Sequence, residues 1–290
     1  YVNSVTPQSK RVKSVVEHLG YQGDVGGPRY HRTERTEYGF GLEFPVAYDD
    51  SSVLVLNHAM GSVSTSGGGP YTHTMRIDNS ASLGLTAEVV KGDSGRAETY
   101  EGVVFSSFTL SCERGGMLMF SGDAIAETST LDSASTPSYH SGRPSWVEYD
   151  EAGSVGWNSL TLDRLVSMSI SVDRKLDRRV LLGSTDTKEP TRSSYVDVTI
   201  SMTVEWDDAD VVLEDHLGTD QSDWALTFTG LDSKSLSITG HNAICTDVSQ
   251  ALNGRGVLER TYEYKTFADN STDRGLTIVV TNDNSSASDN

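Results

Sequence analysis

The chain contains two similar segments, and this internal repeat constrains its fold more than any other feature. Residues 48–58 (YDDSSVLVLNH) match residues 206–216 (WDDADVVLEDH) without a gap. Both have an aromatic residue, an Asp pair, an apolar stretch and a His in the same order. A strand followed by an Asp-capped helix is common, so chance similarity is the alternative reading. An internal repeat sets the architecture of a chain, and 290 residues accommodate two modules of roughly 130 to 150 residues.

Alternation of polar and apolar residues predicts strands throughout the chain. Residues 197–206 alternate over ten positions, with Val198, Ile200, Met202 and Val204 apolar. Successive side chains of a strand point to opposite faces, so this strand has one dry face and one wet face. The matching positions of the first copy, Phe40 to Val46, follow the same pattern. Further strands are expected near residues 71–78, 83–90, 97–104, 107–112, 117–126, 166–173, 224–230, 234–239, 257–267 and 275–281.

Helical spacing is confined to the two repeated segments. Apolar residues recur at helical intervals after Asp49-Asp50 and after Asp207-Asp208. The Asp pairs suit helix N-termini, and Gly61 and Gly218 suit helix ends. We therefore expect an all-β fold with minor α structure, in which each of two tandem β-sandwich modules carries one short flanking helix.

The remaining segments are predicted to be loops. Residues 20–37 and 174–194 each precede the matching strand of their own copy, and both gather cations. Residues 128–156 are rich in Ser, Gly and Pro and link the copies. The expected organisation is an N-terminal module over 1–128, a linker over 129–159, a C-terminal module over 160–282 and a polar tail over 283–290.

The charge balance excludes several classes of partner. The net charge is -18, with 41 acidic and 23 basic residues. A surface that grips nucleic acid needs basic patches, and so does one that binds anionic membranes. No apolar run is long enough to span a membrane as a helix. Cys112 and Cys245 do not occupy equivalent positions of the repeat, and two free buried thiols are favoured over a disulfide.

The sequence predicts no catalytic, cofactor or metal site. Residues 92–95 (GDSG) resemble a serine protease nucleophile segment, but the partners that a triad needs lack their context. Residues 269–275 (DNSTDRG) vaguely resemble a calcium loop, but they lack the Gly and Glu that such a loop requires. Both segments are interpreted as turns.

Several segments in combination resemble the major tail tube proteins of long-tailed viruses and prophages. The GFGLEF strand at 39–44 is followed by the helix near 49–60 and by GPYTHTM at 69–75. The strands AEVVKG at 87–92 and YEGVVFSSFTL at 100–110 come next. The resemblance covers residues 10–128 well and 160–282 more loosely, because the second copy has WALTF at 224–228 where YTH would stand.

The resemblance implies that subunits form rings and that rings stack into a hollow tube. Inner sheets of neighbouring modules would join into one barrel. Six modules with four strands each give about 24 strands, a backbone radius of about 24 Å and a bore of roughly 35–40 Å, which admits duplex DNA. If both halves are tube modules, three chains make a pseudo-sixfold ring. If only one half lines the bore, the ring is a hexamer.

The family pattern also implies roles for particular residues. The best candidates for the bore lining are Glu43, Asp197, Thr199, Ser201, Thr203 and Glu205. The candidates for contacts between rings are Arg29, Arg32, Arg35, Arg178, Arg179 and Arg192. Ordinary solvated surface is the alternative for both sets. The expected partners are other copies of the chain, tail terminator and tail-tip proteins, and DNA that passes without specific binding.

Other functions compete with this interpretation. An extracellular β-sandwich, such as a carbohydrate-binding or surface-layer module, is the main alternative, although the repeat and the lack of an aromatic platform weigh against it. A tube inside a contractile sheath would give a similar sequence. For a tail tube, the protein is expected in the virion tail after assembly in the host cytoplasm. Its acidity also suits a host that lives in high salt.

Overall fold

The computed structural model describes residues 4–16, 30–49, 51–77, 84–90, 95–135, 145–158, 160–180, 187–205, 220–251, 258–268 and 275–285. Antiparallel strands dominate, and 16 of them belong to one extended sheet. The first strands and the helix are β1 (Ser4–Val16), β2 (Tyr30–Pro45), α1 (Ser51–Met60), β3 (Gly61–Ser66), β4 (Tyr71–Ile77), β5 (Leu85–Val90), β6 (Arg96–Glu113), β7 (Met119–Ala126) and β8 (Thr128–Ser133). The remaining elements are the 3-10 turn η2 (Tyr149–Glu151), β9 (Val155–Trp157), β10 (Leu160–Leu162), β11 (Leu165–Asp173), β12 (Leu176–Val180), β13 (Thr187–Arg192), β14 (Asp197–Glu205), β15 (Ser222–Thr229), β16 (Ser235–Ala251), β17 (Glu259–Lys265) and β18 (Leu276–Asn282). The predicted all-β class with minor α structure is confirmed.

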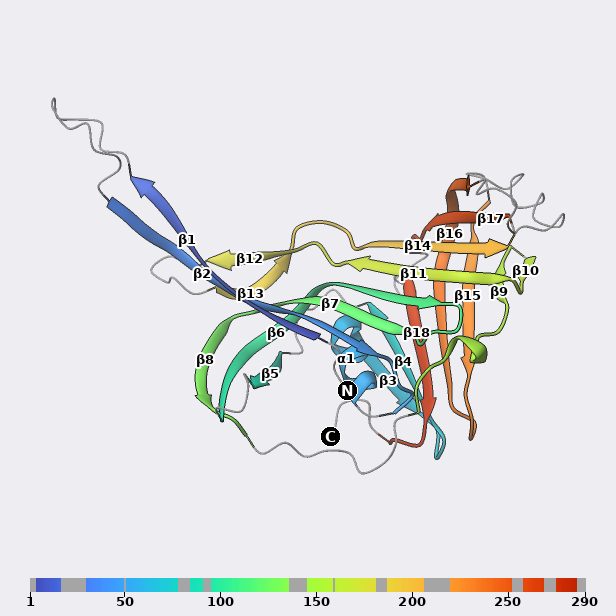
Figure 1. Ribbon diagram of the computed structural model, residues 1–290, viewed down its shortest axis with the longest axis horizontal. Coiled ribbons are helices and arrows are strands. Elements are labelled where there is room, and N and C mark those ends of the chain that lie inside the picture. The colour runs from blue at the N-terminus through green and yellow to red at the C-terminus, as the bar shows by residue number, and fades with distance from the viewer. Residues whose placement is uncertain are drawn as a thin grey trace.

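Eight strands form a continuous layer in which one arrangement occurs twice. Its order is β1-β2-β7-β6 followed by β11-β14-β17-β16. If the four strands of a quartet are numbered along the chain, their order across the sheet is first, second, fourth, third in both quartets. The quartets meet where β6 pairs with β11 (Figure 1). The repeat seen in the sequence is therefore also a repeat of strand order.

The third strand of each quartet is long and leaves the layer at its first half. The start of β6 pairs with β5 and β8, and its end pairs with β7 and β11. The start of β16 pairs with β15 and β18, and residues 244–251 pair with β17. A bulge interrupts the β6–β7 ladder between Phe105 and Ser107. Another interrupts the β16–β17 ladder between Cys245 and Asp247. Both quartets therefore have a bulge in the ladder between their third and fourth strands.

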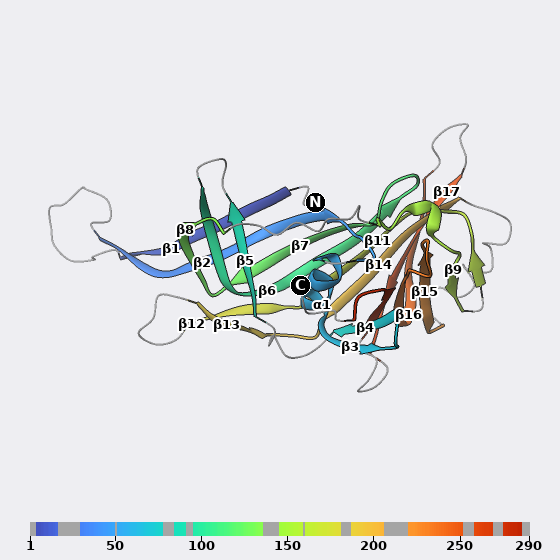
Figure 2. The same cartoon turned by 90° about the horizontal axis from the view of Figure 1, so that it is seen from below.

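A second layer joins the two halves again. Strand β18 pairs with β4, and β4 pairs with β3. The helix α1 contacts β3, β4 and β6 (Figure 2). The halves of the chain are thus held by two independent ladders, β6–β11 and β4–β18.

The first predicted helix is confirmed and the second lies outside the described residues. The helix ends at Met60, and Gly61 has a φ of 96°, which a residue without Cβ adopts readily. At the other end, Ser52 Oγ accepts a hydrogen bond of 3.1 Å from Ala47 N. Asp49 makes a 2.7 Å ion pair with Lys234 of the second half. The segment 206–218 is not described.

One core runs through both quartets. Phe120 of β7 packs against Phe44, Phe105 and Phe108, with ring centroids 5.0 to 5.6 Å apart. In the second half, Trp157 lies against Tyr264 at 5.3 Å, and both are buried. Such aromatic clusters bury large apolar areas and specify the packing of the layers.

The expectation of loops over 20–37 and 174–194 was wrong for the described parts. Strand β2 already begins at Tyr30, and β12 and β13 form a separate two-stranded ladder. The segment 128–156 likewise contains β8, η2 and the start of β9. Figures 1 and 2 show the β1–β2 arm and the β12–β13 hairpin extending beyond the packed layers. A strand alternates between polar and apolar residues where one face is buried, so arms of this kind carry little periodic signal.

Candidate functional site

The most distinctive surface is the polar face of the eight-stranded layer. Direct pairing places residues of seven strands in one row, and paired residues share a face of a sheet. That row is Ser4, Glu43, Ser121, Thr109, Ser171, Thr199 and Lys265. The six predicted bore-lining residues, Glu43, Asp197, Thr199, Ser201, Thr203 and Glu205, all lie on this face and are exposed or half-buried.

The opposite face of the same strands is dry. Leu110, Ile170 and Ile200 are neighbours on β6, β11 and β14, and each has an exposure of 0%. One apolar face and one Ser/Thr-rich face in a single sheet fit a wall with core behind it and water in front.

Sequence reasoning missed several residues of the polar face. They come from β6, β7, β11 and β17, and include Thr109, Ser111, Ser121, Asp123, Ser167, Ser169, Ser171, Thr261 and Glu263. The alternation of Ser in β11 is visible in the sequence and could have indicated that this strand contributes to the polar face. In β7 the alternation is weak, because Gly122 and Ala124 stand at positions of the dry face where other strands have large apolar residues.

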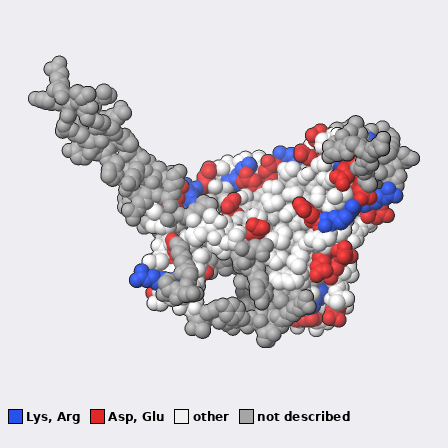
Figure 3. Space-filling model, in the orientation of Figure 1, with Lys and Arg blue, Asp and Glu red and all other residues white. Residues whose placement is uncertain are grey.

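Ion pairs anchor the acidic groups near the ends of the polar face. Lys265 Nζ lies 2.9 Å from Asp197 Oδ1, and Arg114 lies 2.6 Å from Glu205. Lys175 contacts Asp173 at 2.6 Å. Burial alone would raise the pKa of Asp173, but the hydrogen bonds from Lys175 outweigh it and the pKa is lowered. Acidic residues outnumber basic ones in the whole chain, and Figure 3 shows the two kinds interspersed on the visible surface.

The predicted inter-ring arginines fall mainly on the two arms. Arg32 and Arg35 lie on β2, Arg178 and Arg179 lie on β12, and Arg192 ends β13. Arg29 lies outside the described residues. The β12–β13 hairpin lies beside β2, because a Cβ at Gly39 would be 3.4 Å from the Arg178 guanidinium. The structure thus brings Arg178 close to the arm that carries Arg32 and Arg35.

Two strand edges of the layer have no pairing partner among the described residues. Strand β1 pairs with β2 alone, and residues 244–251 of β16 pair with β17 alone. These edges lie at opposite ends of the layer. Unpaired edges are available for pairing with another chain.

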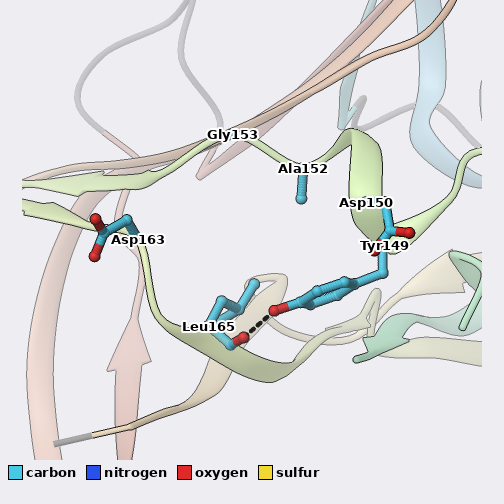
Figure 4. A pocket seen from close by; sticks show the side chains of 6 residues that line it. All are labelled: Tyr149, Asp150, Ala152, Gly153, Asp163 and Leu165. Carbon is cyan, nitrogen blue, oxygen red and sulfur yellow. Dashed lines mark hydrogen bonds between the residues drawn. The ribbon is translucent and has the colours of Figure 1, made fainter. Parts of the chain in front are cut away.

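A small cavity of about 260 Å³ lies beside η2. Figure 4 shows its lining, in which the Tyr149 hydroxyl donates a hydrogen bond to the Leu165 carbonyl. Asp150 and Asp163 also line it. The described residues contain no group of three side chains that could hold a metal ion, and no helix among them is long and apolar enough to cross a membrane.

Both cysteines are buried free thiols. Burial is the main cause that raises the pKa of Cys112 to about 11 and that of Cys245 to about 11. A thiol with such a pKa is almost wholly protonated at neutral pH and reacts slowly. Engineered surface cysteines can therefore be labelled against an unreactive background.

Comparison with known proteins agrees with this geometry. The sequence matches the family described as phage tail tube protein over residues 24–273. A search of curated proteins finds no significant match. The family match spans most of the chain and includes every strand of the two quartets except β1. The chain belongs to the phage tail tube protein family.

Proposed function

We propose that this tail tube protein assembles into rings that stack into a hollow tube, through which viral DNA reaches the host. The observation that carries the proposal is the eight-stranded layer, which has a dry face, a polar face and two edges that are unpaired within the described part of the chain. Open edges on a twisted sheet can be satisfied by closing a barrel. Membership of the phage tail tube protein family supports a structural role in the virion tail.

The repeated strand order favours a ring of three chains. Each chain contributes two quartets in the same order, so three chains supply about 24 strands to one barrel. A hexamer would need one quartet of each chain to leave the barrel, and the β6–β11 ladder opposes that separation.

The polar face is proposed to line the bore. Its hydroxyl groups and carboxylates repel phosphates or bind them weakly, so DNA can slide. The arms that carry Arg32, Arg35, Arg178, Arg179 and Arg192 are proposed to reach the acidic surface of an adjacent ring. The terminal rings would bind tail terminator and tail-tip proteins.

The proposal is tested by assembly of the purified protein. Light scattering and negative-stain microscopy of concentrated protein are expected to show rings and tubes. Trimers and hexamers are distinguished by the mass of the smallest ring. A sample that stays monomeric even when tail-tip components are added to nucleate it would contradict the proposed function.

The orientation of the sheet can be tested by thiol labelling. In Thr199→Cys, a bulky thiol reagent is expected to react with free subunits and to react poorly with assembled tubes. Thr229→Cys is the matched control, since Thr229 is exposed on β15, outside the eight-stranded layer, and is expected to react in both forms. Labelling of Thr199→Cys in tubes with protection of Thr229→Cys would show that the polar face points away from the bore.

Tube stability is expected to fall when the salt concentration is lowered. Repulsion between the 41 acidic residues of each chain acts over about 10 Å at 0.1 M salt and over about 3 Å at 1 M. Tubes that dissociate between molar and about 0.1 M NaCl, as seen by microscopy, would support adaptation to a saline host. Tubes that are unchanged or more stable at low salt would contradict this adaptation, and the acidic residues would then be explained by the lining of the bore alone.

A further inference from the structure

We infer that neighbouring chains of the ring join through β16 of one chain and β1 of the next, in the register of the chain's own β6–β11 ladder. This inference rests on the proposed function and specifies its partner surface. The occupant of each open edge is a second copy of this chain. The inference follows from three observations: the internal joint, the equivalence of strands and the half-buried residues at the edges.

The internal joint is a complete ladder between the two quartets. Leu110 faces Ile170 on the dry side, and both are fully buried. Ser111 faces Ser169 on the polar side. This joint shows how the last strand of one quartet fits the first strand of the next.

The positions in the layer identify the equivalent strands. Strand β16 ends the second quartet as β6 ends the first, and β1 begins the first quartet as β11 begins the second. A chain placed beside its copy therefore brings β16 next to β1.

Cross-strand pairs fix which residues of β1 and β11 correspond. Leu42 matches Ile200 in the sequence repeat. Val5 pairs with Leu42, and Ile170 pairs with Ile200. Val5 is thus the counterpart of Ile170.

The same reasoning relates β6 to β16. Phe44 matches Met202 in the repeat. Phe44 pairs with Phe120, and Phe120 pairs with Leu110. Met202 pairs with Tyr262, and Tyr262 pairs with Val248. Val248 is therefore the counterpart of Leu110.

Transfer of the internal register then gives the pairs between chains. Val248 of one chain faces Val5 of the next, as Leu110 faces Ile170. Ser249 faces Ser4, as Ser111 faces Ser169. Val5 and Val248 are half-buried and already pack against the core, so the joint would complete their burial.

The same register accommodates a proline at the edge. Pro7 would lie opposite Thr246, at the bulge between Cys245 and Asp247. Proline has no N–H to donate, and a bulged residue is left out of the regular ladder. The bulge belongs to the β16–β17 ladder, and it shows that the backbone at Thr246 departs from regular strand geometry at the position where Pro7 lacks a donor.

The test is a pair of cysteines in one chain. In tubes of Ser4→Cys/Ser249→Cys, oxidation or a short bifunctional thiol reagent is expected to convert the monomer band on a non-reducing denaturing gel into dimers and trimers. Opposed residues of antiparallel strands lie about 4.5–5.5 Å apart at Cβ. A ring of three limits the covalent products to trimers.

Ser4→Cys/Val248→Cys is the matched control, because a shift of one residue moves a side chain to the other face. It should remain monomeric on the gel. If wild-type tubes form but the matched pair stays uncrosslinked, or the shifted pair crosslinks instead, the register is wrong while the proposed function stands.

A measurement on the wild type covers variants that fail to assemble. Hydrogen exchange of peptides spanning residues 4–9 and 244–251 is expected to slow markedly when subunits form tubes. Unchanged exchange in both peptides, with tubes present, would overturn the inference. If wild-type protein forms no tubes, it is the proposed function itself that fails.

Discussion

Replacement of Asn282 by Ala is expected to lower the free energy of unfolding by about 3 kcal/mol, since buried polar groups would lose their partners. Asn282 has an exposure of 0% and its Nδ2 donates to the Tyr48 carbonyl at 2.8 Å. Its Oδ1 accepts from His73 Nε2 and from Asn284 N, each at 3.0 Å. His73 is equally buried, and its Nδ1 accepts from the Thr65 hydroxyl at 2.9 Å.

This network connects the end of the chain to the first half of the fold. Asn282 and His73 lie on β18 and β4, the second of the two ladders between the halves. Chemical denaturation of Asn282→Ala and of Asp283→Ala, an exposed neighbour, measures the effect. The control should change stability by less than about 0.5 kcal/mol. Equal stability of the two variants would show that the network contributes little.

Gly39→Ala is expected to destabilise the protein by about 2 to 3 kcal/mol, through overpacking against backbone that has to move. A Cβ at position 39 would lie 2.4 Å from the Ala124 carbonyl oxygen of β7. The ladder between β2 and β7 would have to shift, and the contact with Arg178 of the arm would shift with it.

Gly41→Ala is the control on the same strand. Its Cβ would meet its closest atom, Asp123 Oδ1, at 3.5 Å, which is ordinary van der Waals contact. Alanine also has less conformational entropy to lose on folding, so this variant should be neutral or slightly more stable. Thermal unfolding of both variants decides the matter, and similar melting temperatures would rule out a steric role for Gly39.

The parts of the fold that pack against a core were predictable from the sequence. Strands such as β14 and β11 were recognised because Ile200 and Ile170 alternate with Ser and Thr. The helix α1 was recognised from its apolar spacing and from Gly61. In each case burial on one side imposes a period on the sequence.

The arms and the pairing between halves were not predictable in the same way. Residues 187–192 (TKEPTR) do not alternate between polar and apolar residues, so the sequence has no period that predicts a strand there. The β4–β18 ladder joins residues about 200 positions apart, and no local pattern encodes such a contact. The polar face was predicted for one strand in full, whereas its extension across β7 depends on register, which the structure supplies.

The covalent union of two quartets has a consequence for the energetics of association. In a ring of six modules, three of the lateral joints would already exist inside the chains as β6–β11 ladders. Each independent body that joins an assembly loses translational and rotational freedom, at a cost of about 4–15 kcal/mol. Three bodies rather than six must then be collected, and the effective concentration of each second module is set by the fold rather than by the amount of protein in the cell. A ring built this way closes at a lower protein concentration than one built from single modules.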